Sequence, residues 1–195
     1  MKIQKNSFLL KFFAPLGVLL LTAAVVLTIG WQWNIHTAAK KMTGYVHTLR
    51  AAMPTPQGAA IEQRSNNTMP ALSLNGTDFV GILEIPRFDA ALPVGADWGN
   101  SARFPCRFDG SIYDSSMQIG ATSQKGQFDF YRQIAVGDPV FFTDMEGNRY
   151  VYTITDLRYA QHADQAELGR KGAPLTLFIK NVYALEYIIV FCDAA

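Results

Sequence analysis

Residues 137–154 read GDPVFFTDMEGNRYVYTI. The two arms of this stretch, 140–143 and 150–154, are rich in β-branched and aromatic residues, which favour strands. Between the arms, Glu146-Gly147-Asn148 supplies turn residues. The stretch therefore predicts a β-hairpin, and a hairpin core is typical of an antiparallel β domain.

Further short strand candidates lie on both sides of this hairpin. They cover residues 79–85, 90–94, 117–122, 175–179 and 187–191. A short helical turn or two is expected over 164–171. Short strands with turn signals and little helix favour an all-β domain, either a closed barrel or a sandwich.

The N-terminal segment differs in composition. Lys2, Lys5 and Lys11 precede an uncharged, apolar run over residues 12–31. Twenty residues of helix span about 30 Å, the thickness of the hydrocarbon core of a bilayer. The run predicts a single-pass transmembrane helix, and Trp31 and Trp33 suit its interface. The lysine-rich tail favours a cytoplasmic N-terminus, with the remainder of the chain outside the cell membrane.

Two alternatives to a membrane anchor stay open. One is a signal peptide cleaved near residues 37–39, and the other is a buried core helix. After the anchor, apolar residues recur at helical spacing from 34 to 53, and Pro54 and Pro56 end that pattern. Residues 54–76 are polar and read as a spacer. The expected division is an anchor over 1–33, a helical stalk and linker over 34–76, and a β domain over 77–195.

Charge and rare residues limit the function classes. Seventeen basic and 16 acidic residues give a net charge of +1, without the basic excess of a nucleic-acid-binding protein. His36, His47 and His162 lie at no metal-ligand spacing, so neither a metal site nor a cofactor is expected. His162 is expected to be an exposed loop residue. Outside the cytoplasm, Cys106 and Cys192 form either a disulfide or two buried thiols.

Four local motifs resemble those of the sortase family. FPCRF with Gly110-Ser111 (residues 104–111) resembles a stretch of class B-like sortases of Gram-positive bacteria. The hairpin at 137–152 is similar to the sortase Gly-Asp-x-Val…Tyr-x-Tyr hairpin. LTLF at 175–178 resembles the start of the strand that carries the sortase cysteine, and GILEIP at 81–86 fits the opening strand. The resemblance implies a sortase-type closed β-barrel of about seven or eight strands with short helices.

The same resemblance implies a transpeptidase that uses a Cys nucleophile, a His acid–base partner and an Arg at the oxyanion. Counted from the matching motifs, the His, Cys and Arg positions fall on Thr122, Lys180 and Tyr187. All three side chains differ from those of the family. The interpretation is a catalytically degenerate sortase on the cell surface, whose partner is a sorting-signal-like peptide, a pilin or an active sortase. The alternative is an active transpeptidase or hydrolase that uses a Thr122–Lys180 dyad, and a third option is a structural surface module.

Overall fold

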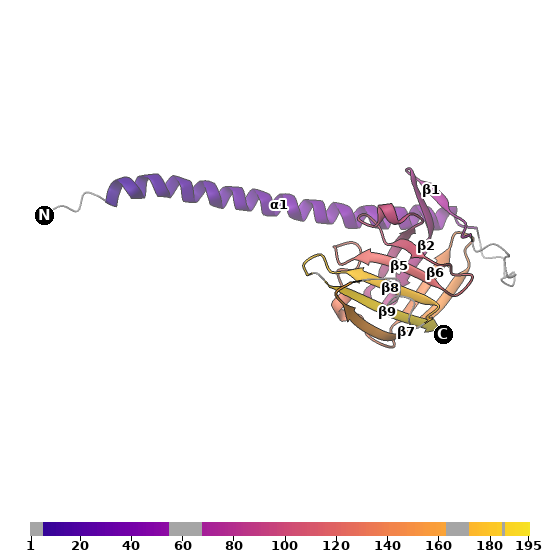
Figure 1. The fold of residues 1–195 in the computed structure, drawn as a ribbon. Coiled ribbons are helices and arrows are strands. Elements are labelled where there is room, and N and C mark those ends of the chain that lie inside the picture. Colours follow the sequence, from indigo (N-terminus) through magenta and orange to yellow (C-terminus); the bar gives the residue numbers. More distant parts are fainter. Residues whose placement is uncertain (1–5, 55–67, 163–171, 185) are drawn as a thin grey trace. The chain divides into compact units, whose positions relative to one another are not determined.

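The structure, a computed structural model, describes residues 6–54, 68–162, 172–184 and 186–195, with only the backbone for 6–14 and 31–39. Within these ranges the chain forms one α-helix and nine strands, with three short 3-10 helices (Figure 1). They are α1 (Asn6–Ala52), β1 (Leu72–Leu74), β2 (Thr77–Ile85), η1 (Pro86–Phe88), β3 (Ala90–Gly95), η2 (Trp98–Asn100), β4 (Cys106–Asp109), β5 (Met117–Thr122), η3 (Tyr131–Gln133), β6 (Pro139–Asp144), β7 (Arg149–Ala160), β8 (Leu175–Lys180) and β9 (Tyr187–Ala194).

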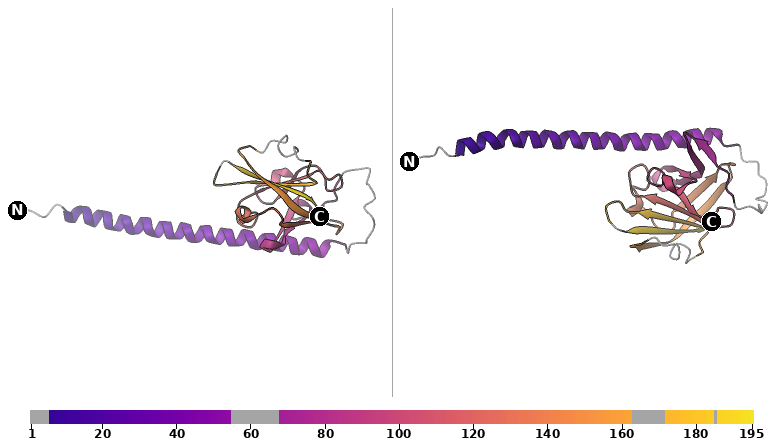
Figure 2. Two further views of the ribbon diagram at one scale, coloured as in Figure 1. Left: turned by 90° about the horizontal axis from the view of Figure 1, so that it is seen from below. Right: turned by 45° about the horizontal axis from the view of Figure 1, so that its top comes forward.

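Eight of these strands close into a ring, which confirms the predicted closed β-barrel. The order is β2-β3-β4-β5-β8-β9-β7-β6, and a β2–β6 pairing closes it, while β1 pairs with β2. Most neighbours are antiparallel, but β5 runs parallel to β8 over six residue pairs. The weakest join lies between β3 and β4, where one pair, Gly95 and Cys106, holds the register. Figure 2 shows the strands wrapped around the common interior.

The barrel interior is filled by alternate residues of its strands. Leu175, Leu177 and Ile179 of β8 belong to this interior cluster, as do Ile188 and Val190 of β9. Residues with the opposite parity point outward, because successive side chains of a strand face opposite sides of the sheet. Ala173, Phe178, Ile189 and Phe191 form a separate outer-face cluster. The outer face of β8 and β9 is therefore apolar rather than a simple solvated surface.

A helix-side cluster explains the amphipathic pattern predicted for residues 34–53. Met42, Val46 and Leu49 of α1 are buried with Phe79 and Phe104 of the barrel. Tyr45 adds edge and tilted ring contacts to the same two phenylalanines, with centroids 5.2–5.4 Å apart. The predicted end of the helix before Pro54 is confirmed, since α1 ends at Ala52.

The chain divides into two compact units, Met1–Ala38 and Ala39–Ala195. In the first unit the apolar side chains of α1 between residues 15 and 30 are largely exposed. The predicted transmembrane helix is not confirmed: within the part of the chain that the structure describes, no helix combines the length and the hydropathy needed to cross a membrane.

Several predicted strands match the structure closely, and two were missed. The prediction for 117–122 coincides with β5, and the hairpin is present, with β7 continuing to Ala160. The predicted spacer over 54–76 lies outside the described residues for 55–67, and its last part contains the short strand β1, which was not predicted. Strand β4 was not predicted at all. The helical turn expected over 164–171 lies wholly outside the described residues.

Candidate functional site

The three positions taken from the sequence motifs lie side by side. Thr122 ends β5, Lys180 ends β8 and Tyr187 opens β9. Thr122 pairs with Lys180, and Lys180 pairs with Tyr187. Neighbouring strands are about 4.8 Å apart, so the three Cα atoms lie within about 10 Å. We call this set the Thr–Lys–Tyr row.

The row faces outward. Lys180 has the parity of Phe178, which belongs to the outer-face cluster, whereas Ile179 between them lies in the barrel interior. Register partners on neighbouring strands share a face, so Thr122 and Tyr187 lie on the same outer surface. Tyr187 is partly buried against the outer-face cluster. The row thus stands at one end of an apolar floor.

The chemical groups of the row are a hydroxyl, an ammonium and a phenol. Lys180 is exposed, and no ion pair to it occurs among the described residues. The Thr122 Oγ1 is shielded from solvent and has no hydrogen-bond partner among the residues that the structure describes. The backbone N–H of Thr122 donates to Gln127 Oε1 at 3.0 Å, which holds the strand end in place. A thiolate and an imidazole, the groups of cysteine acyl transfer, are not among these three side chains.

Both cysteines lie away from the row. Cys106 belongs to the helix-side cluster and Cys192 to the barrel interior, and both are free thiols, so the disulfide alternative is wrong. Burial, aided by the charge of Asp97, raises the pKa of Cys106 to about 12. Burial also raises the pKa of Cys192, with a further contribution from Asp193. Both thiols stay protonated at neutral pH and are poor nucleophiles.

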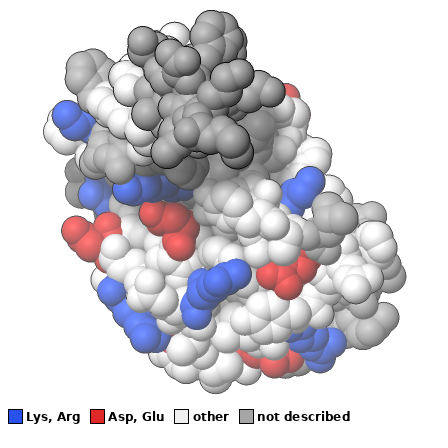
Figure 3. Space-filling model, turned by 90° about the vertical axis from the view of Figure 1, so that its left-hand side faces the viewer, with Lys and Arg blue, Asp and Glu red and all other residues white. Residues whose placement is uncertain are grey.

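The histidine and metal predictions concern other parts of the surface. His162 is exposed after the end of β7, as predicted for a loop residue. Among the described side chains, no three His, Cys, Asp or Glu residues gather in a way that could hold a metal ion. Figure 3 views the barrel end at which β5 and β8 terminate. Lys and Arg are interspersed there with Asp and Glu, without a large field of one sign.

Trp98 is a site residue that the sequence interpretation missed. Its ring packs against Phe108 and Phe178, with centroids 5.1 and 5.4 Å away. A Cβ atom at Gly120 would lie 2.1 Å from Trp98 Cζ3 and 2.4 Å from Phe178 Cζ. Only glycine fits under the indole at this point. Gly120 lies two residues before Thr122 in β5 and faces the same side of the sheet. The Asp97 carboxylate accepts the Gly99 N–H at 2.9 Å and fixes the turn that presents the indole.

Trp98 is nevertheless 40% exposed. One side of the indole lies on the aromatic floor and the rest meets solvent. A glycine inside a strand often marks a close approach, so Gly120 was the signal in the sequence. The partner of that glycine could not be read from the sequence, because Trp98 begins η2 in the connection between β3 and β4.

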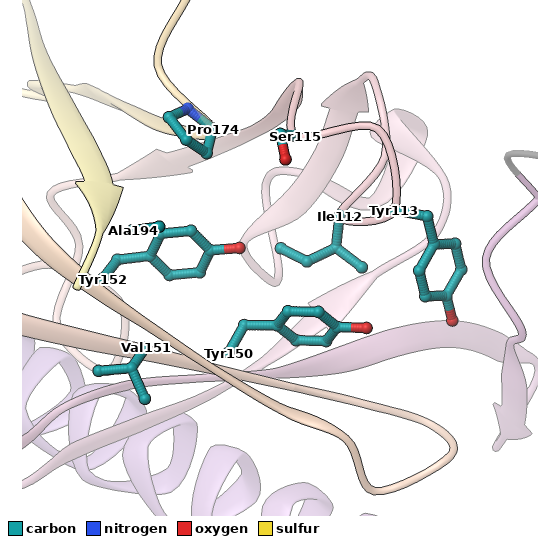
Figure 4. Close-up of a pocket in the computed structure, with 8 residues that line it drawn as sticks. All are labelled: Ile112, Tyr113, Ser115, Tyr150, Val151, Tyr152, Pro174 and Ala194. Carbon is teal, nitrogen blue, oxygen red and sulfur yellow. The ribbon is translucent and has the colours of Figure 1, made fainter. Parts of the chain in front are cut away.

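A hollow lies at the opposite end of β5 and β8 from the Thr–Lys–Tyr row. Its volume is about 310 Å³, and Figure 4 shows the side chains of Tyr113, Tyr150 and Tyr152 around it. Pro174, which also lines it, directly precedes β8, so five residues of strand separate it from Lys180. Pro174 and Lys180 are six residues apart, so at about 3.3 Å per residue their separation is about 20 Å.

This hollow adjoins a buried carboxylate that organises the hairpin turn. Asp144 accepts the N–H groups of Glu146 and Asn148 at 2.9 Å. The hydroxyls of Tyr113 and Tyr150 donate to the same carboxylate at 3.3 Å. Burial raises the pKa of Tyr150, and the charge of Asp144 raises it further. These contacts account for Asp144 as a structural residue of the hairpin.

Comparison with known proteins gives the fold class. Neither a protein-family model nor a curated protein matches the chain. Solved structures do match, and they are sortases, so the barrel has the sortase fold.

Three of these structures overlap most of the chain. Sortase A from Corynebacterium diphtheriae is similar with a TM-score of 0.52 and 15% identity, covering 83% of this chain and 84% of its own. Sortase C-1 from Actinomyces oris has a TM-score of 0.52 and 14% identity, with coverages of 80% and 98%. Sortase C1 from Streptococcus agalactiae has a TM-score of 0.52 and 18% identity, with coverages of 83% and 88%. At these identities the likeness concerns the fold alone.

Proposed function

We propose that this chain is a catalytically degenerate sortase that binds an extended peptide on the outer face of β5, β8 and β9. The observation that carries the proposal is the Thr–Lys–Tyr row, whose members are register neighbours at the positions that the motifs assign to the sortase His, Cys and Arg. Loss of the nucleophile alone lowers acyl-transfer rates by several orders of magnitude. Ordinary sortase turnover is therefore not expected from these residues.

The surface next to the row suits a peptide backbone with apolar side chains. Phe178 and Ile189 form a buried apolar layer, at 3% and 1% exposure, and Trp98, whose ring packs against Phe178, presents its exposed part to a ligand. Val182 and Tyr183, in the loop between β8 and β9, are also exposed, at 39% and 79%. Aromatic side chains of this kind contribute much of the affinity in binding sites, because they bury large areas with few rotatable bonds.

The proposed partner is a sorting-signal-like peptide, and a pilin or an active sortase can present such a segment. The proposed location is the outer side of the cell membrane, with a cytoplasmic N-terminus. Its support is the lysine-rich tail, the apolar run over 12–31 and the exposed apolar side chains of α1. Assignment to the class B-like group rests on the stretch 104–111 alone.

An enzymatic alternative has one observation in its favour. Thr122 and Lys180 are direct register partners, and within the described ranges the Thr122 hydroxyl makes no hydrogen bond, as a nucleophile awaiting a base would. Against it, Lys180 is exposed to solvent, whereas catalytic lysine bases are generally desolvated. We therefore favour binding without chemistry.

Two measurements on the purified full chain test the proposal. The first follows cleavage of a quenched fluorescent Leu-Pro-Ala-Thr-Gly peptide, with and without a glycine acceptor. The second measures saturable retention of a sequence-randomised hexapeptide pool. Retention without cleavage is the expected result. Cleavage that is lost in Lys180→Ala would establish the enzymatic alternative, and a lack of retention would refute peptide binding.

A further inference from the structure

The Thr–Lys–Tyr row contains a cation, Lys180, without an ion-pair partner among the described residues. The Lys180 side chain is exposed on the outer face and has no acidic partner within the described residues. Glu186, which directly precedes Tyr187, already accepts a hydrogen bond from Asn181 Nδ2 at 2.8 Å. Asp193 shares the outer parity of Tyr187 but lies six residues further along β9, about 20 Å away.

A hydrogen-bond donor without a partner lies next to this cation. The Thr122 Oγ1 has almost no solvent contact and makes no hydrogen bond to any described residue. Shielded polar groups are nearly always satisfied, so an unsatisfied one calls for an explanation such as a missing ligand. Because Thr122 and Lys180 are register partners about 4.8 Å apart at their Cα atoms, one small anion can meet both groups.

The surroundings of the row restrict the ligand further. The row stands where β5 and β8 end, and the loop to β9 closes the surface beyond it. Val182 N–H donates to Ser123 Oγ at 3.1 Å, and Asn181 N–H donates to the Glu186 carbonyl at 3.0 Å, which braces that loop. One ammonium and one hydroxyl match the two oxygens of a single carboxylate.

We propose that Lys180 and Thr122 form a carboxylate-binding subsite at the end of the peptide surface. The inference rests on the proposed function, since it names the chemical class of the bound peptide. The carboxylate is supplied either by a free C-terminus or by an Asp or Glu side chain. A free C-terminus is what peptide-bond hydrolysis leaves, so a ligand of that kind would be a cleaved product rather than an intact substrate.

Three randomised hexapeptide pools test this subsite on the full chain. The first pool has free C-terminal carboxylates and lacks Asp and Glu. The second has the same sequences with C-terminal amides, and the third has amide ends with one Asp or Glu. A charge-assisted hydrogen bond in place of none corresponds to a preference of roughly tenfold or more. We expect that preference for the first or the third pool over the second, and the pool that is favoured identifies the source of the carboxylate.

Variants connect the preference to the two residues. Lys180→Gln should reduce the carboxylate pools to the retention of the amide pool, while Lys180→Arg should keep most of the preference because it keeps the charge. Thr122→Val should weaken the preference without removing it. Lys41→Gln, an exposed lysine on α1, serves as the matched control and should change nothing.

The outcomes separate the subsite from the function on which it rests. Equal retention of all three pools overturns the carboxylate subsite and leaves peptide binding in place. A preference that persists in Lys180→Gln also overturns the subsite. If no pool is retained, both the subsite and the proposed function fail.

Discussion

Replacing Gly120 by alanine should loosen Trp98 from the outer face of the barrel. The new methyl group would lie 2.1 Å from Trp98 Cζ3 and 2.4 Å from Phe178 Cζ, far inside contact distance. Phe178 is buried and has little room to move, whereas Trp98 is 40% exposed and can swing into solvent. The indole would then lose its ring contacts with Phe108 and Phe178.

The size of the effect follows from those two ring contacts. Each aromatic pair contributes about 0.5–1.5 kcal/mol beyond area burial, and overpacking generally destabilises by about 1–3 kcal/mol. We expect Gly120→Ala to lower the free energy of unfolding by about 2 kcal/mol. With a urea dependence of about 2 kcal/mol per molar, the midpoint of urea unfolding should fall by about 1 M.

The same chemical change at Gly44 is the matched control. Gly44 lies within α1, and a Cβ atom there would meet nothing within 4 Å. A glycine inside a helix is about 0.5–1 kcal/mol less favourable than alanine, so Gly44→Ala should raise the midpoint. Near-ultraviolet circular dichroism reports both midpoints. Shifts of the same sign in the two variants, or an unchanged midpoint in Gly120→Ala, would refute the placement of the indole over residue 120.

Three further results are expected. Leu49→Ala should lower the free energy of unfolding by about 2–5 kcal/mol in thermal melts, because the side chain is fully buried; the exposed Leu27→Ala should stay within about 0.5 kcal/mol, and equal effects would contradict the helix-side packing. Asp144→Asn should cost about 1–3 kcal/mol and let Tyr150 ionise at lower pH, since the Asp144 charge raises that pKa; ultraviolet titration against the parent is the check. Burial raises the pKa of the Cys106 thiol to about 12 in the folded chain, whereas the unfolded chain loses this proton near the ordinary pKa of 9.0. The free energy of unfolding should therefore fall as the pH rises between these two values, and it should fall less in Cys106→Ala. An identical alkaline decline in both proteins would oppose the buried-thiol assignment.

The strands that the sequence predicted well are those with a long apolar pattern. Strands β5 and β8 match the expected limits within a residue because their inward positions are Met, Ile and Leu and their ends meet turn residues. Strands β1 and β4 have three and four residues, too few to show an alternating pattern. Their extended conformation depends on pairing with β2 and β5, which no local pattern can report.

The N-terminal helix shows the limits of composition as a guide to structure. The change from apolar to mixed sequence near residue 33 suggested separate anchor and stalk segments, but the backbone continues as one helix from Asn6 to Ala52. Helix formation tolerates both compositions, so a change of environment along a helix leaves no break in its hydrogen bonding.

The candidate site was partly predictable because its three residues lie on strands. Counting from motifs gave Thr122, Lys180 and Tyr187, and register pairing brings them together, because strand positions translate directly into sheet neighbours. The contact between Trp98 and Gly120 depends on how a loop folds back over the sheet, and a loop has no comparable rule. That the row matches the sortase catalytic positions stays a prediction.

The single residue pair between β3 and β4 is the weakest backbone connection in the barrel wall. Among the described residues, the Gly95 N–H bonded to the Pro105 carbonyl at 2.8 Å and the Gly95–Cys106 pair hold that join, and the connection that contains Trp98 spans it. Local openings of a protein begin where few backbone bonds need to break. Backbone amides flanking this join should therefore exchange with deuterated solvent sooner than those of β8. A ligand that holds the Trp98 indole in place should slow that exchange. The exchange rate at the β3–β4 join would then report whether the outer surface is occupied.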